Sequence, residues 1–146
     1  MDKTSFSQET AVIEIKSTPK SFHMITDDVA QWVQSINANI GVVTLFVQHT
    51  SASLIVQENA DPSVISDLSN ALDGIAPEGP DYAHSMEGPD DMPGHIKSML
   101  TSTSLSVPVI DGGLDLGTWQ GIFLIEHRAA SNNRKLRLLF AGSIGH

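Results

Sequence analysis

The stretch VVTLFVQHTSASLIV, residues 42–56, decides the fold. Val42 to Val47 is a continuous apolar run and predicts a buried strand. Ser53 to Val56 has the composition of the strand that follows it, and the small residues Thr50 to Ala52 join the two. His49 therefore stands at a strand end, beside hydroxyl groups and on a backbone that the strand holds rigid.

Two helices are predicted on either side of this stretch. Thr26, followed by Asp27 and Asp28, has the oxygen cap and the early acidic residues of a helix start. Asp61-Pro62 is a second start, because proline needs no N–H at the first helical position. Apolar residues then recur at helical spacing to Ile36 in the first helix and to Leu72 in the second.

The remaining segments add strands and one long loop. Four segments are strand-like, and Asp111-Gly112 is a hairpin signal: Ala11–Ile15, Ser104–Ile110, Trp119–Arg128 and Arg134–Phe140. Residues 76–94 are rich in proline and glycine and predict a loop, with a short helix from His95 to Leu100. Strands without regular βαβ alternation favour an α+β fold with a largely antiparallel sheet.

Composition narrows the class of protein. The chain has 146 residues, which fits a single domain spanning 1–146. It has no cysteine, so any metal must be held by His, Asp or Glu. The formal net charge of −9 argues against nucleic-acid binding. No apolar run is long enough for a membrane span, and the N-terminus does not have the pattern of a signal peptide, so we expect a cytoplasmic protein.

The basic residues are unevenly placed. Four of the eight, Arg128, Arg134, Lys135 and Arg137, fall close together near the C-terminus. A solvated hairpin with charged tips explains this cluster, and so does a site for an anion.

Three histidines, His49, His84 and His95, are the candidate metal ligands. With a nearby carboxylate they form a usual set for Zn²⁺, with a water or substrate in the open position. His84 and His95 converge only if the long loop folds back on itself. The competing readings are a solvated acidic loop and, for His49, a core histidine that bonds a backbone carbonyl.

The strand from Trp119 to Arg128 has two faces. Gln120 and Glu126 share one face, which would place an amide and a carboxylate in one cleft, and His127 points the other way. Alternatively, Glu126 pairs with Arg128 or Arg137.

Read together, several motifs closely resemble the YjbQ-like family, whose members are often named secondary thiamine-phosphate synthase enzymes. The resemblance covers nearly the whole chain. In chain order the motifs are His49-Thr50-Ser51-Ala52-Ser53, Gln57-Glu58-Asn59-Ala60-Asp61-Pro62, Tyr82-Ala83-His84, Gly88 to Ser98, and Leu116 to Ile122.

The resemblance implies a barrel-like or sandwich-like antiparallel sheet with two to three helices packed on it, and assembly as a homotrimer. It also implies a polar pocket near the subunit boundary that holds a metal, with Zn as our expectation, or a phosphate- or sulfate-like anion. His49, His84 and His95 are its implied metal ligands, with His127 as a doubtful fourth. Glu126, Asp91 and Asn59 are the candidate catalytic residues, and the candidate ligand-binding residues are Asp61, Trp119, Gln120, Ser51 and Arg128.

Two functions follow as hypotheses. In the first, the protein acts on a small phosphorylated metabolite, with the weak thiamine-phosphate synthase activity that the resemblance implies. In the second, it is a non-catalytic oligomer that binds an anionic ligand or a protein partner. A third reading, in which the loop histidines and acids only make trimer contacts, also remains open.

Overall fold

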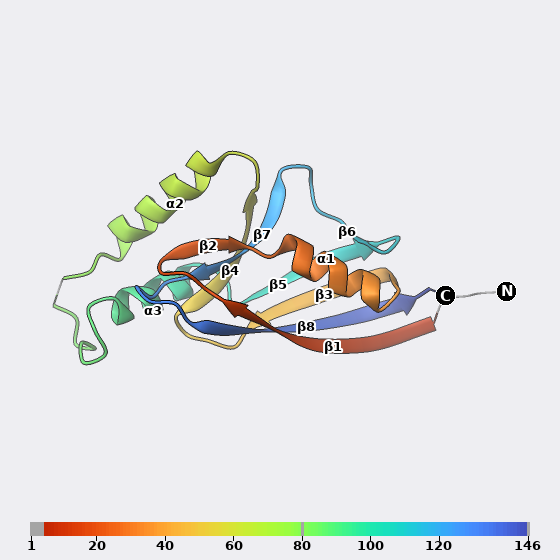
Figure 1. Cartoon of the computed structure of the whole chain (residues 1–146), viewed down its shortest axis with the longest axis horizontal. Helices are drawn as coiled ribbons and strands as arrows, with labels where there is room; N and C mark the ends of the chain where they lie inside the picture. Colours follow the sequence, from red (N-terminus) through yellow and green to blue (C-terminus); the bar gives the residue numbers. More distant parts are fainter. Residues whose placement is uncertain (1–4, 80, 146) are drawn as a thin grey trace.

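The computed structural model describes residues 5–79 and 81–145, which fold as an α+β protein (Figure 1). The elements are β1 (Ser5–Lys16), β2 (Ser21–Met24), α1 (Thr26–Ser35), β3 (Ala38–Val47), β4 (Ala52–Glu58), α2 (Pro62–Ile75), α3 (Asp91–Leu100), β5 (Ser104–Ile110), β6 (Gly113–Leu114), β7 (Gln120–Glu126) and β8 (Asn133–Ile144). The predicted fold class is confirmed.

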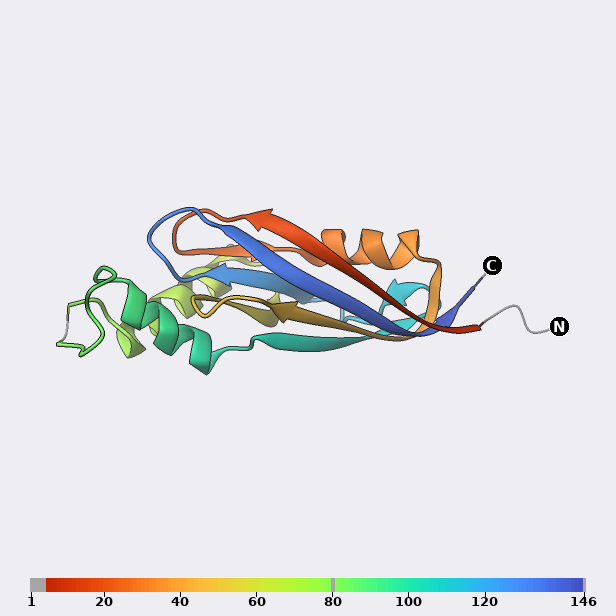
Figure 2. The same cartoon turned by 90° about the horizontal axis from the view of Figure 1, so that it is seen from below.

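The strands form two sheets in which every pairing is antiparallel. One sheet has the order β1-β8-β3-β5-β6 and the other β2-β7-β4. Seen from below, the long strands β1 and β8 twist together, α1 lies on one side of their sheet, and α3 with the loop before it extends beyond one end of these strands (Figure 2). In the described part of the chain, no helix is long and apolar enough to cross a membrane.

Strand β3 shows how the core is built. Val43, Leu45 and Val47 point inward and are almost fully buried, while Val42 and Phe46 are 42% and 47% exposed. The apolar run was predicted to be buried throughout, and this is wrong for its outer face. The reason is that the described helices cover only the inner face of this sheet, where Val29 and Val33 of α1 join the core.

Two glycines let β3 and β8 approach each other closely. A Cβ atom on Gly142 would lie 2.6 Å from the Cα of Gly41 and 2.9 Å from the ring of Phe140. The register of the two strands also shifts between Ala38 and Gly41. Only glycine fits here, because any side chain would overlap backbone atoms.

Several elements differ from the prediction: β1 and β8 are longer than predicted, the two-residue β6 was not predicted, and α3 and β2 differ most. Helix α3 begins at Asp91 instead of His95, so Pro93 and Gly94 lie inside its first turn. Proline is tolerated there because the first backbone N–H groups of a helix have no intrahelical partner. Strand β2 was not predicted, and it extends the second sheet by pairing with β7.

Candidate metal site

Two of the three predicted histidines meet one carboxylate. His84 Nε2 lies 2.6 Å and His95 Nε2 3.2 Å from the same oxygen, Oδ2 of Asp91. One ligand atom from each of the three residues lies within 4.8 Å of the other two. The Asp91 side chain is almost fully buried, whereas His84 and His95 are partly exposed. A partly open group of two imidazoles and a carboxylate can hold a divalent metal.

Local structure explains why these residues converge. Asp91 is the first residue of α3, and His95 follows one helical turn later, so both side chains lie on the same face of the helix. His84 comes from the loop between α2 and α3, which returns to the helix through a left-handed Gly88 with φ of 102°. The loop thus folds back on itself, which is the condition under which His84 and His95 converge.

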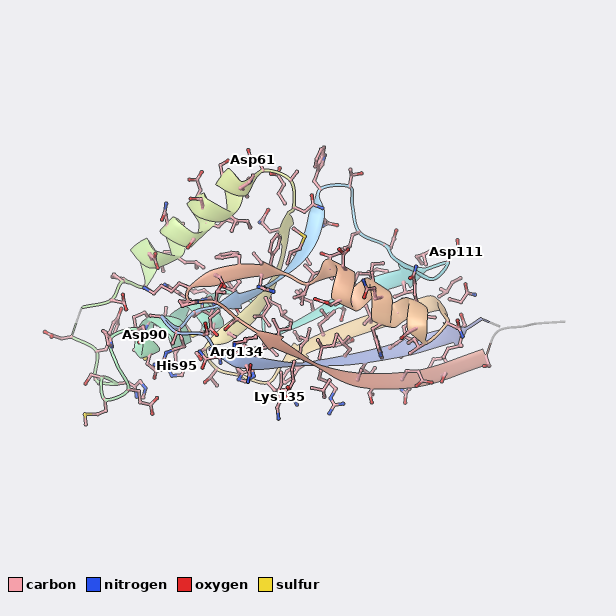
Figure 3. All side chains as sticks on the ribbon, in the orientation of Figure 1. Asp61, Asp90, His95, Asp111, Arg134 and Lys135 are labelled. Carbon is pink, nitrogen blue, oxygen red and sulfur yellow. The ribbon has the colours of Figure 1, made fainter. Side chains whose placement is uncertain are left out.

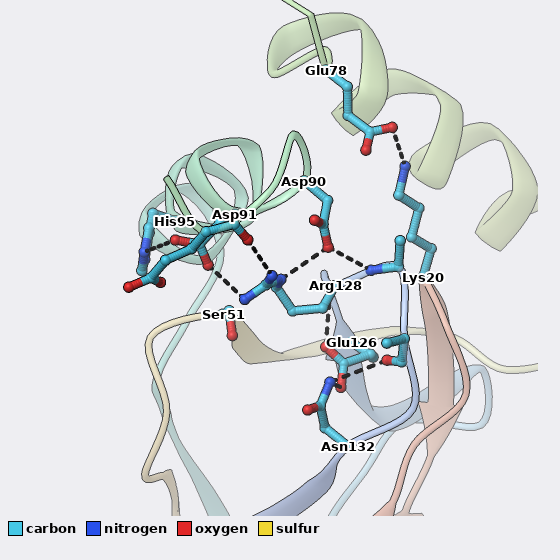
Figure 4. Close-up of polar contacts among 12 residues, drawn as sticks. Lys20, Ser51, Glu78, Asp90, Asp91, His95, Glu126, Arg128 and Asn132 are labelled. Atoms are coloured by element: carbon cyan, nitrogen blue, oxygen red, sulfur yellow. Dashed lines mark hydrogen bonds and ion pairs between the residues drawn. The ribbon is translucent and has the colours of Figure 1, made fainter. Parts of the chain in front are cut away.

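Arg128 fixes the carboxylate from the side away from the histidines (Figure 4). Its Nη1 donates to Asp91 Oδ1 at 2.7 Å, its Nε donates to Asp90 Oδ2 at 2.9 Å, and its Nη2 donates to the Glu87 carbonyl at 3.0 Å. Arg128 was predicted to bind a ligand. In this structure three of its five N–H donors bond to the protein itself, and Oδ2 of Asp91 is the oxygen that faces the histidines.

The electrostatics of the site favour ionised carboxylates. Burial would raise the pKa of Asp91, but the hydrogen bond from His84 and the charges of His95 and Arg128 hold it below its usual value. For Asp90, the hydrogen bond from Arg128 is the main cause of a lowered pKa. An ionised Asp91 is the form that a metal requires.

The orientation of His95 depends on a main-chain group. Its Nδ1 lies 3.1 Å from the carbonyl oxygen of Thr50, which can only accept a hydrogen bond. Nδ1 must therefore carry a proton. In the neutral ring this leaves a lone pair on Nε2, which points at the carboxylate of Asp91. Either a second proton or a cation must separate these two electron-rich atoms.

The structure does not bring His49 to this group. Its Nε2 accepts a hydrogen bond of 2.8 Å from the backbone N–H of Lys135. Burial, together with the nearby Arg134 charge, lowers the pKa of this half-buried imidazole. The predicted set of three histidines is thus a set of two histidines and an aspartate within this chain.

Glu126 is fully buried and faces Arg134, not Gln120. Its carboxylate accepts hydrogen bonds from Arg134 Nε at 2.8 Å and Ser17 Oγ at 2.6 Å. Burial alone would raise the pKa of Glu126, but these hydrogen bonds and the charge of Arg134 outweigh burial and hold the pKa below its usual value. The expected shared cleft is absent because Gln120 and Glu126 stand at opposite ends of β7. Ser51, expected to bind a ligand, accepts from Arg134 Nη2 at 3.0 Å.

His127 directly follows the end of β7 and does not belong to the His84, Asp91 and His95 cluster. It is buried, and its Nε2 lies 2.8 Å from Ser53 Oγ. Burial, with a smaller contribution from the charge of Lys97, lowers the pKa of His127 to about 4. A neutral buried imidazole bonded to a serine is a structural group.

Four other predicted site residues lie at the far end of the second sheet. Gln120 pairs with Glu58, whereas Glu126 pairs with Ala52 at the other end of the same two strands. Asn59 donates to the Gln120 carbonyl at 3.4 Å, Trp119 is 63% exposed, and Asp61 caps α2 by accepting from the Ser63 N–H at 2.9 Å. Figure 3 shows Asp61 at the start of α2, away from Asp90 and His95.

A cavity of about 410 Å³ adjoins the cluster at His84. Asp81, Tyr82, Ser85 and Met92 are among its lining residues. The loop and α3 together form its walls. A small molecule bound here would lie next to the His84 imidazole.

Fold and site together define a class: an α+β protein with a candidate metal site of two histidines and one aspartate. The chain belongs to the YjbQ family, whose model, described as UPF0047 protein YjbQ-like, matches residues 11–143. The resemblance read from the sequence motifs is thereby confirmed.

Relatives and a solved structure agree with this assignment. A UPF0047 protein of Synechocystis sp. is 45% identical over 141 residues, covering 96% of each chain. UPF0047 protein YjbQ of Escherichia coli O157:H7 is 42% identical over 130 residues, covering 88% of this chain and 93% of the relative. A crystal structure of a yjbq/upf0047 family protein from Clostridium acetobutylicum has a TM-score of 0.83 at 33% identity and covers 89% of this chain and 98% of that one.

Proposed function

We propose that the protein binds a divalent metal ion, with Zn²⁺ as the preferred ion, through His84 Nε2, Asp91 Oδ2 and His95 Nε2. The observation that carries this proposal is the meeting of both Nε2 atoms at one carboxylate oxygen. The remaining polar atoms nearby are already oriented by the protein, since Arg128 holds Oδ1 of Asp91 and the Thr50 carbonyl holds Nδ1 of His95. Such outer contacts are the usual support of a metal ligand.

The chemistry of His95 strengthens the proposal. Its protonated Nδ1 leaves Nε2 as the metal-binding atom of the neutral ring, and a metal between Nε2 and Asp91 removes the conflict of two facing lone pairs. Three protein ligands leave at least one position for water or a substrate. When bound, such an ion supplies a Lewis acid for a phosphate oxygen and lowers the pKa of its water.

We further propose that the ligand is a small phosphorylated molecule, or a phosphate- or sulfate-like anion, bound in the cavity beside His84. Arg128 is engaged with Asp90, Asp91 and the Glu87 carbonyl, so the metal is the group that would contact the anion. The weak thiamine-phosphate synthase activity implied by the family resemblance is proposed for the same cavity.

Metal analysis tests the first proposal directly. Protein purified without chelator or nickel resin is analysed by mass spectrometry for bound metals and then titrated with Zn²⁺ and Mn²⁺ by calorimetry. We expect binding of one ion per chain, lost in His95→Ala. His23→Ala is the matched control, because His23 lies on β2, outside the cluster. Wild-type protein that binds neither ion would contradict the proposal.

We also propose that the chain assembles as a homotrimer. The outer face of the five-stranded sheet supports this, since Val42, Phe46 and Ile110 are 42%, 47% and 44% exposed there. Large apolar side chains gathered on one sheet face are typical of an association surface. Light scattering should give three times the chain mass, and Phe46→Glu should lower it. A monomeric wild-type mass at micromolar concentration would contradict the proposal.

A further inference from the structure

We propose that the buried ion pair of Glu126 and Arg134 is a positioning pair for the metal site. It holds in place the two groups that orient the ligands, the Thr50 carbonyl and the Arg128 side chain. Neither Glu126 nor Arg134 belongs to the ligand cluster itself. This inference rests on the metal binding proposed above and assigns the residues that support it.

Glu126 is a junction between segments that are distant in the sequence. Its Oε1 accepts from Ser17 Oγ, Arg134 Nε and Asn132 Nδ2, and its Oε2 accepts from Arg134 Nη2 and from the backbone N–H of Arg128. Figure 4 shows the bond from Asn132 to Glu126, below α3 in that view. A carboxylate that accepts this many bonds has no free lone pair to offer a substrate.

One arm of this network leads to His95. Arg134 Nη2 donates to the carbonyl oxygen of Ser51 at 3.3 Å and to its hydroxyl at 3.0 Å. These bonds fix the connection between β3 and β4 at the residue next to Thr50. The Thr50 carbonyl then accepts from Nδ1 of His95 at 3.1 Å. Arg134 thus sets the position of the group that selects the tautomer and ring orientation of His95.

The other arm leads to Asp91. The backbone N–H of Arg128 donates to Glu126 Oε2 at 2.9 Å, which fixes the main chain where β7 ends. The side chain of the same residue reaches Oδ1 of Asp91 at 2.7 Å. Glu126 therefore fixes the backbone of Arg128, and the guanidinium of Arg128 fixes the carboxylate of Asp91.

A positioning role explains why the pair is buried and charged. Both side chains are at most 6% exposed, and ions in such a place contribute little net stability compared with apolar side chains of similar volume. A charged pair does, however, impose directional bonds on Ser51 and Arg128, which an apolar pair could not make.

Glu126→Gln tests the role with little change of shape. The amide nitrogen is a donor and would face another donor, either Arg134 or the Arg128 N–H. We expect Zn²⁺ affinity, measured by competition with a chromophoric chelator, to fall about 10- to 100-fold, as is typical when a metal ligand loses its outer partner. The visible absorption spectrum of the Co²⁺-loaded protein should also change, because the geometry around His95 and Asp91 changes.

Val43→Ala is the control for a general loss of stability. Val43 is fully buried in β3 and makes none of these polar contacts. It should lower the free energy of unfolding and leave both the Zn²⁺ affinity and the Co²⁺ spectrum unchanged. If Glu126→Gln fails to fold, Arg134→Lys replaces it, because lysine keeps the charge and loses the forked geometry.

The outcomes separate the two proposals. A folded Glu126→Gln protein with wild-type affinity and spectrum would overturn the positioning role and leave the metal site intact. Equal weakening in Val43→Ala would overturn it as well, since the effect would then follow stability alone. A wild-type protein that does not bind Zn²⁺ would overturn the metal site itself, and with it any role in positioning its ligands.

Discussion

Arg128 binds one oxygen of the Asp91 carboxylate, because its Nη1 donates to Oδ1 at 2.7 Å. The other oxygen, Oδ2, faces the two histidines. In the proposed metal site, Asp91 would therefore offer the ion one oxygen, Oδ2. This contact also explains why a basic residue stands next to a proposed cation site, since the charge of Arg128 is neutralised by Asp90 and Asp91 together.

Replacement of Arg128 by lysine should weaken metal binding. Lysine keeps the positive charge, but its point-like ammonium cannot hold Asp90, Asp91 and the Glu87 carbonyl at once. We expect Zn²⁺ affinity to fall about 10-fold or more. Calorimetric titration measures it, and Arg137→Lys is the control, because Arg137 lies on β8 and outside the cluster. Unchanged affinity in Arg128→Lys would show that Asp91 needs no such hold.

The stability of the protein should depend on His127 in weak acid. Its pKa is about 4 in the folded chain against 6.5 as the ordinary value, so the unfolded chain binds more protons between these two pH values. The stabilisation is fully present above about pH 6.5 and is lost as the pH falls towards 4, at a total of about 3 kcal/mol.

Urea unfolding at several pH values measures this contribution. The carboxylates with lowered pKa values also lose stability in acid, so the test is the difference between wild type and His127→Gln. That difference should shrink as the pH falls from 7 to about 4. A constant difference would mean that His127 does not titrate as a buried neutral group.

Two glycine substitutions should have opposite effects. In Gly142→Ala the new Cβ would overlap the backbone of Gly41, and we expect a loss of about 3 kcal/mol or more. Gly74 lies in α2, and a new Cβ there would meet no described atom within 4 Å apart from its chain neighbours and the backbone of its own helix, so Gly74→Ala should gain about 0.5–1 kcal/mol of stability. Thermal unfolding of both variants checks this, and a stable Gly142→Ala would contradict the tight approach of β3 and β8.

Asp61 should act as a helix cap and not as a ligand. Asp61→Ala removes the acceptor for the Ser63 N–H and should lower the midpoint of thermal unfolding. Because Asp61 lies outside the cluster, Zn²⁺ affinity should not change. Asp61→Ser, which keeps a capping oxygen, should restore most of the stability. A loss of metal affinity in Asp61→Ala would return this residue to the site.

The fold was predictable where local signals were strong. Apolar spacing indicated both α1 and α2, the Asp61 cap marked the start of α2, and the absence of βαβ alternation indicated the α+β class. The predicted oxygen cap of α1 is wrong: Ile25 precedes the helix without a side-chain cap, and the Thr26 hydroxyl instead accepts from the backbone N–H of Ile122 at 2.9 Å. Strand β2 was missed because Ser21 to Met24, although they alternate polar and apolar side chains, are too few to form a clear strand pattern. The start of α3 was missed because Pro93 and Gly94 are typical of loops, although proline fits the first turn of a helix.

The site was predictable in part. His84, Asp91 and His95 were all named from the sequence and meet in the structure. His49 was separated from them by the end of β3, which turns its ring towards the backbone of Lys135. The contact with the Thr50 carbonyl could not be foreseen, because a main-chain group has no side-chain identity to recognise.

All three proposed ligands come from a single short segment, residues 84–95, and the rest of the fold supplies only orientation. An ion held by them would link His84, before the Gly88 turn, to Asp91 and His95, after it, and so hold the two sides of this turn together. Local opening of this segment would have to release the ion, even while both sheets stay folded. Amide hydrogen exchange in residues 84–95 should therefore slow when Zn²⁺ is added, and exchange in this loop and the first turn of α3 would report how much of the protein carries metal.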